Sequence, residues 1–309
     1  MKQADKRFRR SFTAVVSVAV ILLGLFYYLD NRPAEKEVKN ISVVLYDAGN
    51  AAWESLLEGM KQAEATYPVN INYIILEPQA GGSKQLEAIG KEIQNGAQGI
   101  ILAAGDSEMS VIQLNEYAAT IPIITVESGL SDGHFMNLSA DNYEMGSWLA
   151  RELKEDFKDQ EVITIGLMKK EENRDSVRLR YQGFLEELDE KVKIQIIENP
   201  KDYAKVDAYA ALHKKDLHHL TKELDSFGKR TPVYGIGNTP VTVAALEEGK
   251  ITKLVFQNEF NMGYLSIEAL YLRMKGETAE KVREIEAFLV SKEEVYSTKF
   301  ERLLFPIIR

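Results

Sequence analysis

The hydrophobic pattern of the chain changes character after residue 29. Residues 12–29, FTAVVSVAVILLGLFYYL, contain no charged side chain, and a helix of that length reaches about 27 Å, close to the hydrocarbon thickness of a bilayer. Residues 1–11 carry five Lys or Arg against one Asp. Because cytoplasmic flanks collect positive charge, the pattern predicts a single-pass transmembrane helix that leaves residues 1–11 inside and the body extracytoplasmic, at the cell surface or in the periplasm.

A cleaved signal peptide is the alternative for the same segment. The apolar run ends in Phe26, Tyr27, Tyr28 and Leu29, whereas signal peptidase needs small side chains near its cleavage site, so an uncleaved anchor is favoured. The chain has no Cys, which excludes a lipid-modified bacterial lipoprotein. A buried helix of a soluble protein fits poorly because no polar face interrupts the run.

Beyond a charged linker at residues 30–40, short apolar runs alternate with segments of helical periodicity. The runs that predict strands are 41–46, 71–76, 99–104, 122–126, 162–168, 192–197, 207–212, 233–237, 254–256 and 286–290. Helical spacing is clearest in 83–95, 107–117 and 174–188. Near-continuous apolar strands alternating with helices are typical of parallel sheets covered on both faces. The pattern therefore predicts an α/β body of two doubly wound parallel-sheet lobes.

One connection is too short for this pattern. Only nine residues, 198–206, separate the strands predicted at 192–197 and 207–212, and a parallel crossover normally needs a dozen or more. Either one of the two runs is not a parallel strand, or the second lobe has lost a crossover helix. The second interpretation is favoured.

Charge and motifs exclude several functions. The chain has a net charge of −9 and its first 29 residues carry +4, so the body carries −13. Such an acidic body argues against a nucleic-acid partner. Without Cys, and with His218 and His219 adjacent among only four His, no metal site is predicted. No catalytic motif or phosphate-binding loop is present, so neither an enzyme nor a cofactor is expected.

Polar side chains follow most of the predicted strands, where ligands sit in open α/β sheets. The candidate ligand-binding residues are Asn50, Trp53, Asp106, Glu127 and Ser128 in the first lobe, and Arg178, His213, Asn238 and Gln257 in the second, with Arg174 beside Arg178. Amides, acids and a guanidinium both donate to and accept from hydroxyl groups, and an aromatic ring covers the apolar face of a sugar. This mixture suits a small polyhydroxylated ligand.

The body resembles the type I periplasmic binding proteins, and among them the ribose/galactose-type sugar-binding family. The stretches that carry the resemblance are ISVVLYDAGNAAWESLLEGMKQAE, GAQGIILAAGDSE, IPIITVES, LSADNYEMGSWLARELKED, SVRLRYQGFLEEL and PVYGIGNTPVTVAALEEGKITKLVFQNEFNMGYLSIEALYLRMKGE. The resemblance implies two lobes joined by a three-stranded hinge, with 41–140 and 258–286 in lobe 1 and 141–257 and 287–309 in lobe 2.

The resemblance also implies roles for single residues. Asn50 stands where the family binds sugar hydroxyls, Trp53 where an aromatic ring stacks, and Arg178 and Gln257 match a lobe 2 Arg and a hinge amide. Glu127 replaces an Asp, and Ser128 replaces an Arg. In lobe 2, His213 and Lys214 replace an Asn-Asp pair.

A further departure removes an acid that holds two hydroxyls, because Gly237 replaces an Asp, with Asn238 next to it. Structural roles remain open for several candidates. Trp53 could belong to the core, Glu127 and Arg178 could form a hinge ion pair, and Asp106 and Asn238 could cap helices. A structural role is open for His213 as well.

The sequence thus predicts a membrane-anchored, non-catalytic solute-binding protein for a small polar ligand, a monosaccharide or related compound. Its partner would be an ABC permease or a sensor histidine kinase, and the fixed anchor favours sensing. The alternative is an interaction module that kept the fold and lost its ligand. The apolar tail, residues 299–309, is expected to cover the hinge or to dock a membrane partner.

Overall fold

The chain forms two compact units, residues 1–38 and 39–309. The structure, a computed structural model, describes residues 17–27, 37–46, 53–77, 80–106, 109–130, 135–168, 173–198, 206–224, 231–277 and 285–304. In the first unit residues 17–27 form a helix whose large apolar side chains are exposed. Among the described residues no helix has both the length and the hydropathy to span a membrane, and residues 12–16 and 28–29 of the predicted span lie outside them.

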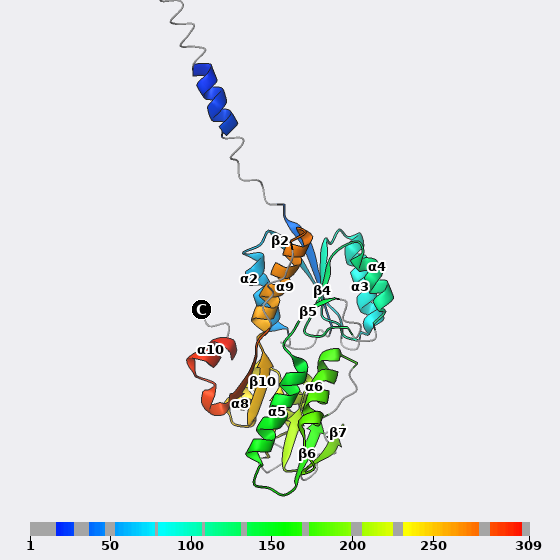
Figure 1. Cartoon of the computed structure of the whole chain (residues 1–309), viewed down its shortest axis with the longest axis vertical. Coiled ribbons are helices and arrows are strands. Elements are labelled where there is room, and N and C mark those ends of the chain that lie inside the picture. The colour runs from blue at the N-terminus through cyan, green and yellow to red at the C-terminus, as the bar shows by residue number, and fades with distance from the viewer. Residues whose placement is uncertain are drawn as a thin grey trace, which may run out of the picture. The chain divides into compact units, whose positions relative to one another are not determined.

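The first lobe of the second unit is built on a five-stranded parallel sheet in the order β2-β1-β3-β4-β5. Its strands are β1 (Lys39–Leu45), β2 (Val69–Ile75), β3 (Gly99–Leu102), β4 (Ile123–Val126) and β5 (Met136–Leu138). Helices α2 (Glu54–Glu64) and α9 (Glu259–Met274) pack together on one face, and α3 (Gly82–Gln94) and α4 (Val111–Ala118) cover the other (Figure 1). The central strands β1, β3 and β4 are buried on both faces, which explains their uninterrupted apolar runs.

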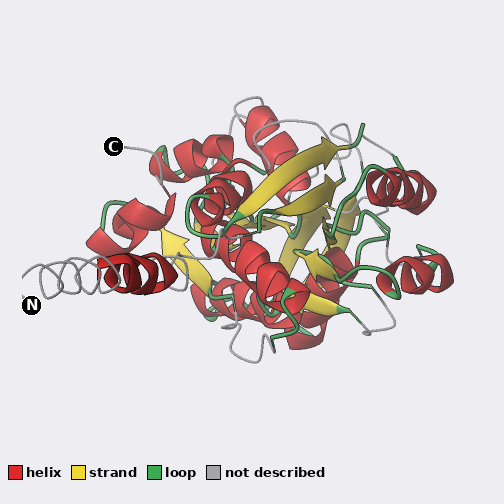
Figure 2. Cartoon of the chain, turned by 90° about the horizontal axis from the view of Figure 1, so that it is seen from above, coloured by secondary structure: helices red, strands yellow, loops and turns green. Residues whose placement is uncertain are grey.

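The second lobe contains a six-stranded sheet in the order β11-β10-β9-β8-β6-β7. Its strands are β6 (Ile163–Met168), β7 (Val192–Ile197), β8 (Ala208–Ala211), β9 (Val233–Ile236), β10 (Lys253–Gln257) and β11 (Ala287–Ser291), and only β11 is antiparallel. Its helices are α5 (Asn142–Asp156), α6 (Asp175–Glu187), α7 (Lys214–Glu223), α8 (Pro240–Glu247) and α10 (Thr298–Leu304). In the view of Figure 2, in which the two lobes overlap, helices lie on both sides of the strands. The predicted two-lobed parallel α/β fold is confirmed.

The short connection after β7 is now explained in part. Strands β7 and β8 both pair in parallel with β6, on its two opposite sides. The interpretation in which one run is not a parallel strand is therefore wrong. No helix occurs in the described part of the connection, residues 198 and 206–207.

The C-terminal helix α10 packs on the edge of lobe 2. Its Phe300 lies against Phe256 and Phe288, with ring centroids 6.2 Å away in both cases. Leu304 is buried in the same core cluster. The predicted tail thus covers strands β10 and β11 as far as residue 304, and residues 305–309 lie outside the described chain.

Each lobe brings two helices together through a reciprocal pair of glycines. A Cβ on Gly146 of α5 would lie 2.0 Å from the Arg180 carbonyl oxygen of α6, and one on Gly183 would lie 2.0 Å from the Tyr143 oxygen. Gly59 and Gly263 form the equivalent contact between α2 and α9. In lobe 2 this close approach also sets the position of Arg180, which matters for the site described below.

We expect Gly146→Ala to lower the free energy of unfolding by about 2–3 kcal/mol, because the backbones of α5 and α6 must separate to admit the methyl group. Urea denaturation monitored by circular dichroism measures the change. Gly24→Ala is the control, since a Cβ at Gly24 meets no atom within 4 Å. A loss below about 0.5 kcal/mol for Gly146→Ala would contradict the helix contact.

Candidate ligand-binding site

The carboxyl ends of the strands carry a cluster of buried polar side chains. In lobe 1 Tyr46 follows β1 and Glu127 follows β4, and in lobe 2 His213 follows β8. Glu127 has φ of 64°, the only positive φ among the described non-glycine residues. Strained backbone of this kind costs about 1–3 kcal/mol and is concentrated at functional sites.

Glu127 joins the two lobes. Its Oε2 accepts a hydrogen bond from the Tyr46 hydroxyl at 2.8 Å, and its Oε1 accepts from the Ser176 hydroxyl at 3.2 Å. The Arg180 guanidinium lies 3.4 Å from the same Oε1. Beside it the Ser176 amide donates to the Ser128 hydroxyl at 3.2 Å. Ser176 and Arg180 belong to α6, so lobe 2 binds directly to the end of β4.

Two further contacts cross between the lobes through aromatic rings. The Arg174 guanidinium lies 4.3 Å from the centre of the Tyr46 ring, and its Nη2 is 2.7 Å from Nε2 of His213. The Lys214 ammonium lies 4.6 Å from the centre of the Trp53 ring and 3.2 Å from the Glu259 carboxylate. Cation–π contacts of this kind are strongest where water is excluded.

Charges in this cluster are balanced within the protein. We call the following buried residues the interlobe cluster: Tyr46, Trp53, Glu127, Ser128, Arg174, Ser176, Arg180, His213, Lys214, Asp216 and Glu259. It holds three acids and three permanent cations, together with one histidine. Since buried charges are costly unless paired, this balance is what allows so many of them to stay in the interior.

The environment sets the protonation of the central groups. Burial raises the pKa of Glu127, but Arg180 and then Arg174 and Lys214 outweigh it, so the pKa lies below its ordinary value and the carboxylate is ionised. Burial lowers the pKa of Arg180, and Glu127 opposes that shift. Burial, followed by the charge of Arg174, holds the pKa of His213 well below its ordinary value, so the imidazole is neutral.

The neutral His213 predicts a pH dependence of stability. Below about pH 6.5 histidines of the unfolded chain bind protons that folded His213 does not bind, so stability is lost as the pH falls from 7 to 5, by up to about 1.4 kcal/mol per pH unit. We expect His213→Gln to reduce that slope, as measured by urea denaturation at several pH values. An unaltered slope in His213→Gln would contradict the buried neutral state.

The structure does not place Arg178 in the site. Arg178 is exposed and pairs with Asp175 one turn earlier on α6. The buried face of the helix carries Ser176, Val177 and Arg180 instead. The predicted partnership of Glu127 with Arg178 is therefore wrong, and Arg180 takes that place. The sequence indicated this position for Arg180, because Arg180 lies three residues after Val177 and four before Phe184. Both are apolar, and this spacing puts all three side chains on one helical face.

Trp53 and His213 both lie in the interlobe cluster, where their neighbours are protein side chains. The Trp53 ring is buried, its Nε1 donates to the Tyr46 carbonyl at 3.0 Å, and Lys214 lies over it. Asn50, predicted beside it, lies outside the described residues. Asp106 is half-buried at the loop after β3, and the residue that caps α4 is Ser110.

Asn238 and Gln257 lie together at a second place, next to the hinge. They line a cavity of about 200 Å³ with Ser55, Asn258, Glu259, Phe260, Asn261, Arg302 and Leu303. Gln257 accepts from the Ala140 amide at 3.2 Å, which connects two passages of the chain between the lobes. Asn238 is not a helix cap either, because Thr239 caps α8. Its Oδ1 is buried without a hydrogen-bond partner in the described structure.

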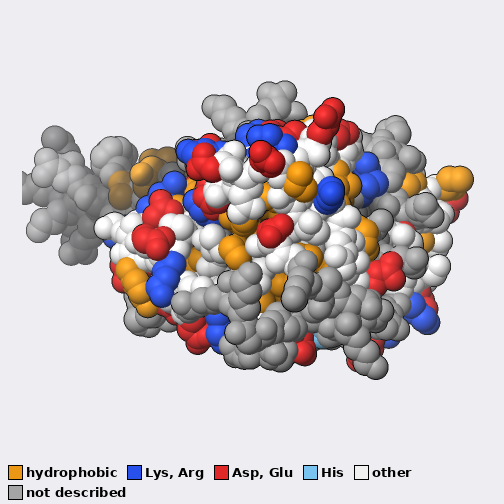
Figure 3. Space-filling model, turned by 90° about the horizontal axis from the view of Figure 1, so that it is seen from below, with side chains coloured by type: hydrophobic (Ala, Val, Ile, Leu, Met, Phe, Trp, Pro, Cys, Tyr) orange, Lys and Arg blue, Asp and Glu red, His pale blue; other side chains and the backbone are white. Residues whose placement is uncertain are grey.

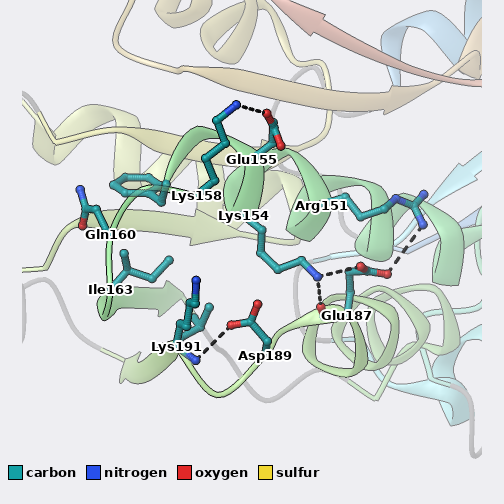
Figure 4. A pocket seen from close by; sticks show the side chains of 11 residues that line it. Arg151, Lys154, Glu155, Lys158, Gln160, Ile163, Glu187, Asp189 and Lys191 are labelled. Carbon is teal, nitrogen blue, oxygen red and sulfur yellow. Dashed lines mark hydrogen bonds and ion pairs between the residues drawn. The ribbon is translucent and has the colours of Figure 1, made fainter.

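Another pocket, of about 280 Å³, lies where β6 and β7 begin, at the opposite edge of the lobe 2 sheet. Figure 4 shows that its charged side chains pair with one another: Arg151 and Lys154 with Glu187, and Lys158 with Glu155. Acidic and basic side chains also intermingle on the face of the molecule in Figure 3. Neither place presents a strong charge of one sign. Within the described residues, no group of three or more metal-binding side chains occurs either.

Comparison with known proteins decides the family. Residues 41–220 match the model of the periplasmic binding protein domain, more than half of the chain. The chain belongs to this family. Members of this family are non-catalytic binding proteins, so the family match confirms the absence of an enzymatic role. No curated protein matches the chain in a sequence search.

Several solved structures of sugar-binding solute-binding proteins share the fold. The glucose-galactose binding protein GanP from Geobacillus stearothermophilus is 22% identical, with a TM-score of 0.75 over 84% of this chain and 100% of its own. An ABC transporter solute binding protein from Agrobacterium vitis with bound D-fucose is 18% identical, with a TM-score of 0.78 over 86% and 100%. A chain of the XylFII-LytSN complex is 14% identical, with a TM-score of 0.72 over 84% and 100%. At these identities the likeness establishes the type I fold.

Proposed function

We propose that this periplasmic binding protein is an extracytoplasmic solute-binding protein that closes its two lobes on a small polar ligand, a sugar. The observation that carries the proposal is the set of polar contacts between lobes around Glu127, at the carboxyl ends of the strands. Ligands of open α/β sheets bind at that edge. The lobes correspond to residues 41–140 with 258–286, and 141–257 with 287–309.

The ligand class follows from the donors and acceptors at this edge. Amides of Asn238 and Gln257, hydroxyls, a carboxylate and guanidinium groups suit hydroxyl groups that both donate and accept. Similar structures include one solved with bound D-fucose and one in complex with D-arabinose. A closed state completes contacts from both lobes, so occupancy is converted into a shape that a second protein reads.

The partner protein that recognises the closed conformation is proposed to be a membrane protein, either an ABC permease or a sensor histidine kinase. Several similar structures are ABC transporter binding proteins, and another comes from the two-protein XylFII-LytSN complex. Residues 12–29 are proposed to anchor the body to the bilayer, which is supported by the exposed apolar helix at residues 17–27. A fixed anchor favours sensing over shuttling. Protease added to intact cells should remove the body, and a protected body would contradict the topology.

One observation favours a second function, an interaction module that no longer binds a ligand. Glu127 already has protein partners on both oxygens, and Lys214 covers the Trp53 ring that would stack on a sugar. A cleft sealed by its own side chains would hold the lobes together without any solute.

Thermal melting of the full chain in detergent, against a set of monosaccharides, separates the two functions. A ligand at a hundredfold excess over its dissociation constant stabilises the folded state by about 3 kcal/mol. We expect at least one sugar to raise the melting temperature, and Arg178→Gln, on the exposed face of α6, to respond like the wild type. A chain that responds to no monosaccharide would instead be the interaction module.

A further inference from the structure

The hinge cavity contains a positive charge that no group in the described protein neutralises. Two of its lining residues are charged, Glu259 and Arg302. The Glu259 carboxylate is paired with the Lys214 ammonium at 3.2 Å. The Arg302 side chain, on the exposed side of α10, makes no ion pair or hydrogen bond with any described residue. Of the two charged side chains that line the cavity, Arg302 is therefore the one without a partner in the described chain.

The rest of the lining offers hydrogen bonds that the described protein leaves unused. The Asn238 Oδ1 is a buried acceptor without a partner. Gln257 uses its oxygen on Ala140, and its amide N–H groups have no partner in the described chain. The α9 helix starts in the cavity wall at Glu259–Phe260–Asn261, where the Asn258 side chain already accepts a hydrogen bond from the Asn261 amide at 3.0 Å. A ligand here has to donate to Asn238, accept from Gln257 and carry negative charge.

Size and charge narrow the chemistry further. About 200 Å³ is below the usual range of pockets for drug-sized ligands, roughly 300–1,000 Å³, so the ligand is small. A single guanidinium matches the single charge and the two oxygens of a carboxylate, which it binds in a bidentate manner. A phosphate would bring nearly two charges against this one cation.

We propose that the ligand is a monosaccharide acid, whose hydroxyl groups bind Asn238 and Gln257 and whose carboxylate binds Arg302 at the hinge. This inference rests on the proposed solute-binding function and specifies the solute. It also gives α10 a role, because the C-terminal helix supplies the residue that selects the charge of the ligand. Its site adjoins the interlobe cluster through Glu259, which belongs to both.

Calorimetric titration of the full chain in detergent tests the proposal. The probes are D-galacturonate and D-glucuronate, their neutral parents D-galactose and D-glucose, and glucose 6-phosphate. We expect one of the acids to bind at least tenfold more tightly than its neutral parent and than the phosphate. Arg302→Gln should weaken binding of the acid about tenfold and leave the neutral sugar unchanged. Asn238→Asp, which places a second negative charge in the cavity, should weaken the acid selectively.

Arg273→Gln is the matched control, since Arg273 is an exposed arginine on α9 that does not line the cavity. Equal binding of an acid and its neutral parent, preference for the phosphate, or unchanged acid affinity in Arg302→Gln would overturn the assignment. Binding of a neutral sugar alone would overturn it while leaving the proposed function intact. Binding of none of the probes, together with no response to the wider set of monosaccharides, would end both.

Discussion

Arg180→Met is expected to lower the free energy of unfolding by about 3–5 kcal/mol at pH 7. Arg180 is 3% exposed and its guanidinium lies against Glu127, which is 2% exposed. Removing the cation leaves a buried carboxylate with less compensation, and breaking a buried ion pair from one side costs about that much. Urea denaturation followed by circular dichroism measures the loss.

Two comparison variants show whether this loss comes from the ion pair. Arg178→Met changes the same side chain on the exposed face of α6 and should cost less than about 1 kcal/mol. Glu127→Gln combined with Arg180→Met removes both charges and should recover part of the stability. An Arg180→Met variant within 1 kcal/mol of the wild type would show that Arg180 does not hold Glu127 in the interior.

The dependence of stability on acidic pH provides a second test of the same ion pair. Because the pKa of Glu127 in the folded wild type lies below its ordinary value, its stabilising contribution is present at neutral pH and is lost as the pH falls through the acid range below about 4.5. In Arg180→Met the largest opposing charge is gone and burial remains, so the folded-state pKa of Glu127 rises and the stability lost on acidification should be smaller than in the wild type.

Phe300→Ala is the second change with a large expected effect, a loss of about 3 kcal/mol. The Phe300 ring is 5% exposed and completes an aromatic trio with Phe256 and Phe288. Truncating a buried aromatic side chain removes its apolar area and leaves a cavity. Here it also removes a contact that holds the short helix α10 on the sheet, so affinity for the sugar acid should fall, as is expected for Arg302→Gln.

Ile112→Ala is the control for this truncation, because Ile112 is 78% exposed and its loss should change stability by less than about 0.5 kcal/mol. If Phe300→Ala unfolds like the wild type, α10 does not pack on lobe 2 as described. If it is destabilised but binds the acid normally, the contribution of α10 to the site is refuted.

The architecture was largely predictable from the sequence because the strands of parallel sheets are buried on both faces and read as apolar runs. Strand β5 was missed because Met136–Leu138 is only three residues long and contains no β-branched residue. The helix predicted from residue 107 begins at Val111, where the Ser110 side chain accepts a hydrogen bond from the Gln113 amide. The local sequence pattern predicts that an element is present better than it predicts where the element begins and ends.

The site was predicted less well, because its contacts join distant parts of the chain. Sequence placed Trp53 and Glu127 at strand ends, but the cation over Trp53 is Lys214, more than 150 residues away. The Arg178 prediction rested on its place after a predicted strand and on the resemblance to the family, and it overlooked the helical face. No sequence pattern indicated a role for Arg302, since its place in the hinge cavity depends on how α10 packs in three dimensions.

The central claim is that polar contacts at the carboxyl ends of the strands couple the two lobes. The chain has no native Cys, so spin labels on cysteines introduced at exposed Glu116 in α4 and Glu155 in α5 report the distance between the lobes by pulsed electron paramagnetic resonance. We expect Arg180→Met to broaden the distribution of this distance and to increase its mean, and we expect saturating ligand to decrease the mean again. One unchanged distribution in the wild type, in Arg180→Met and with ligand bound would contradict the account.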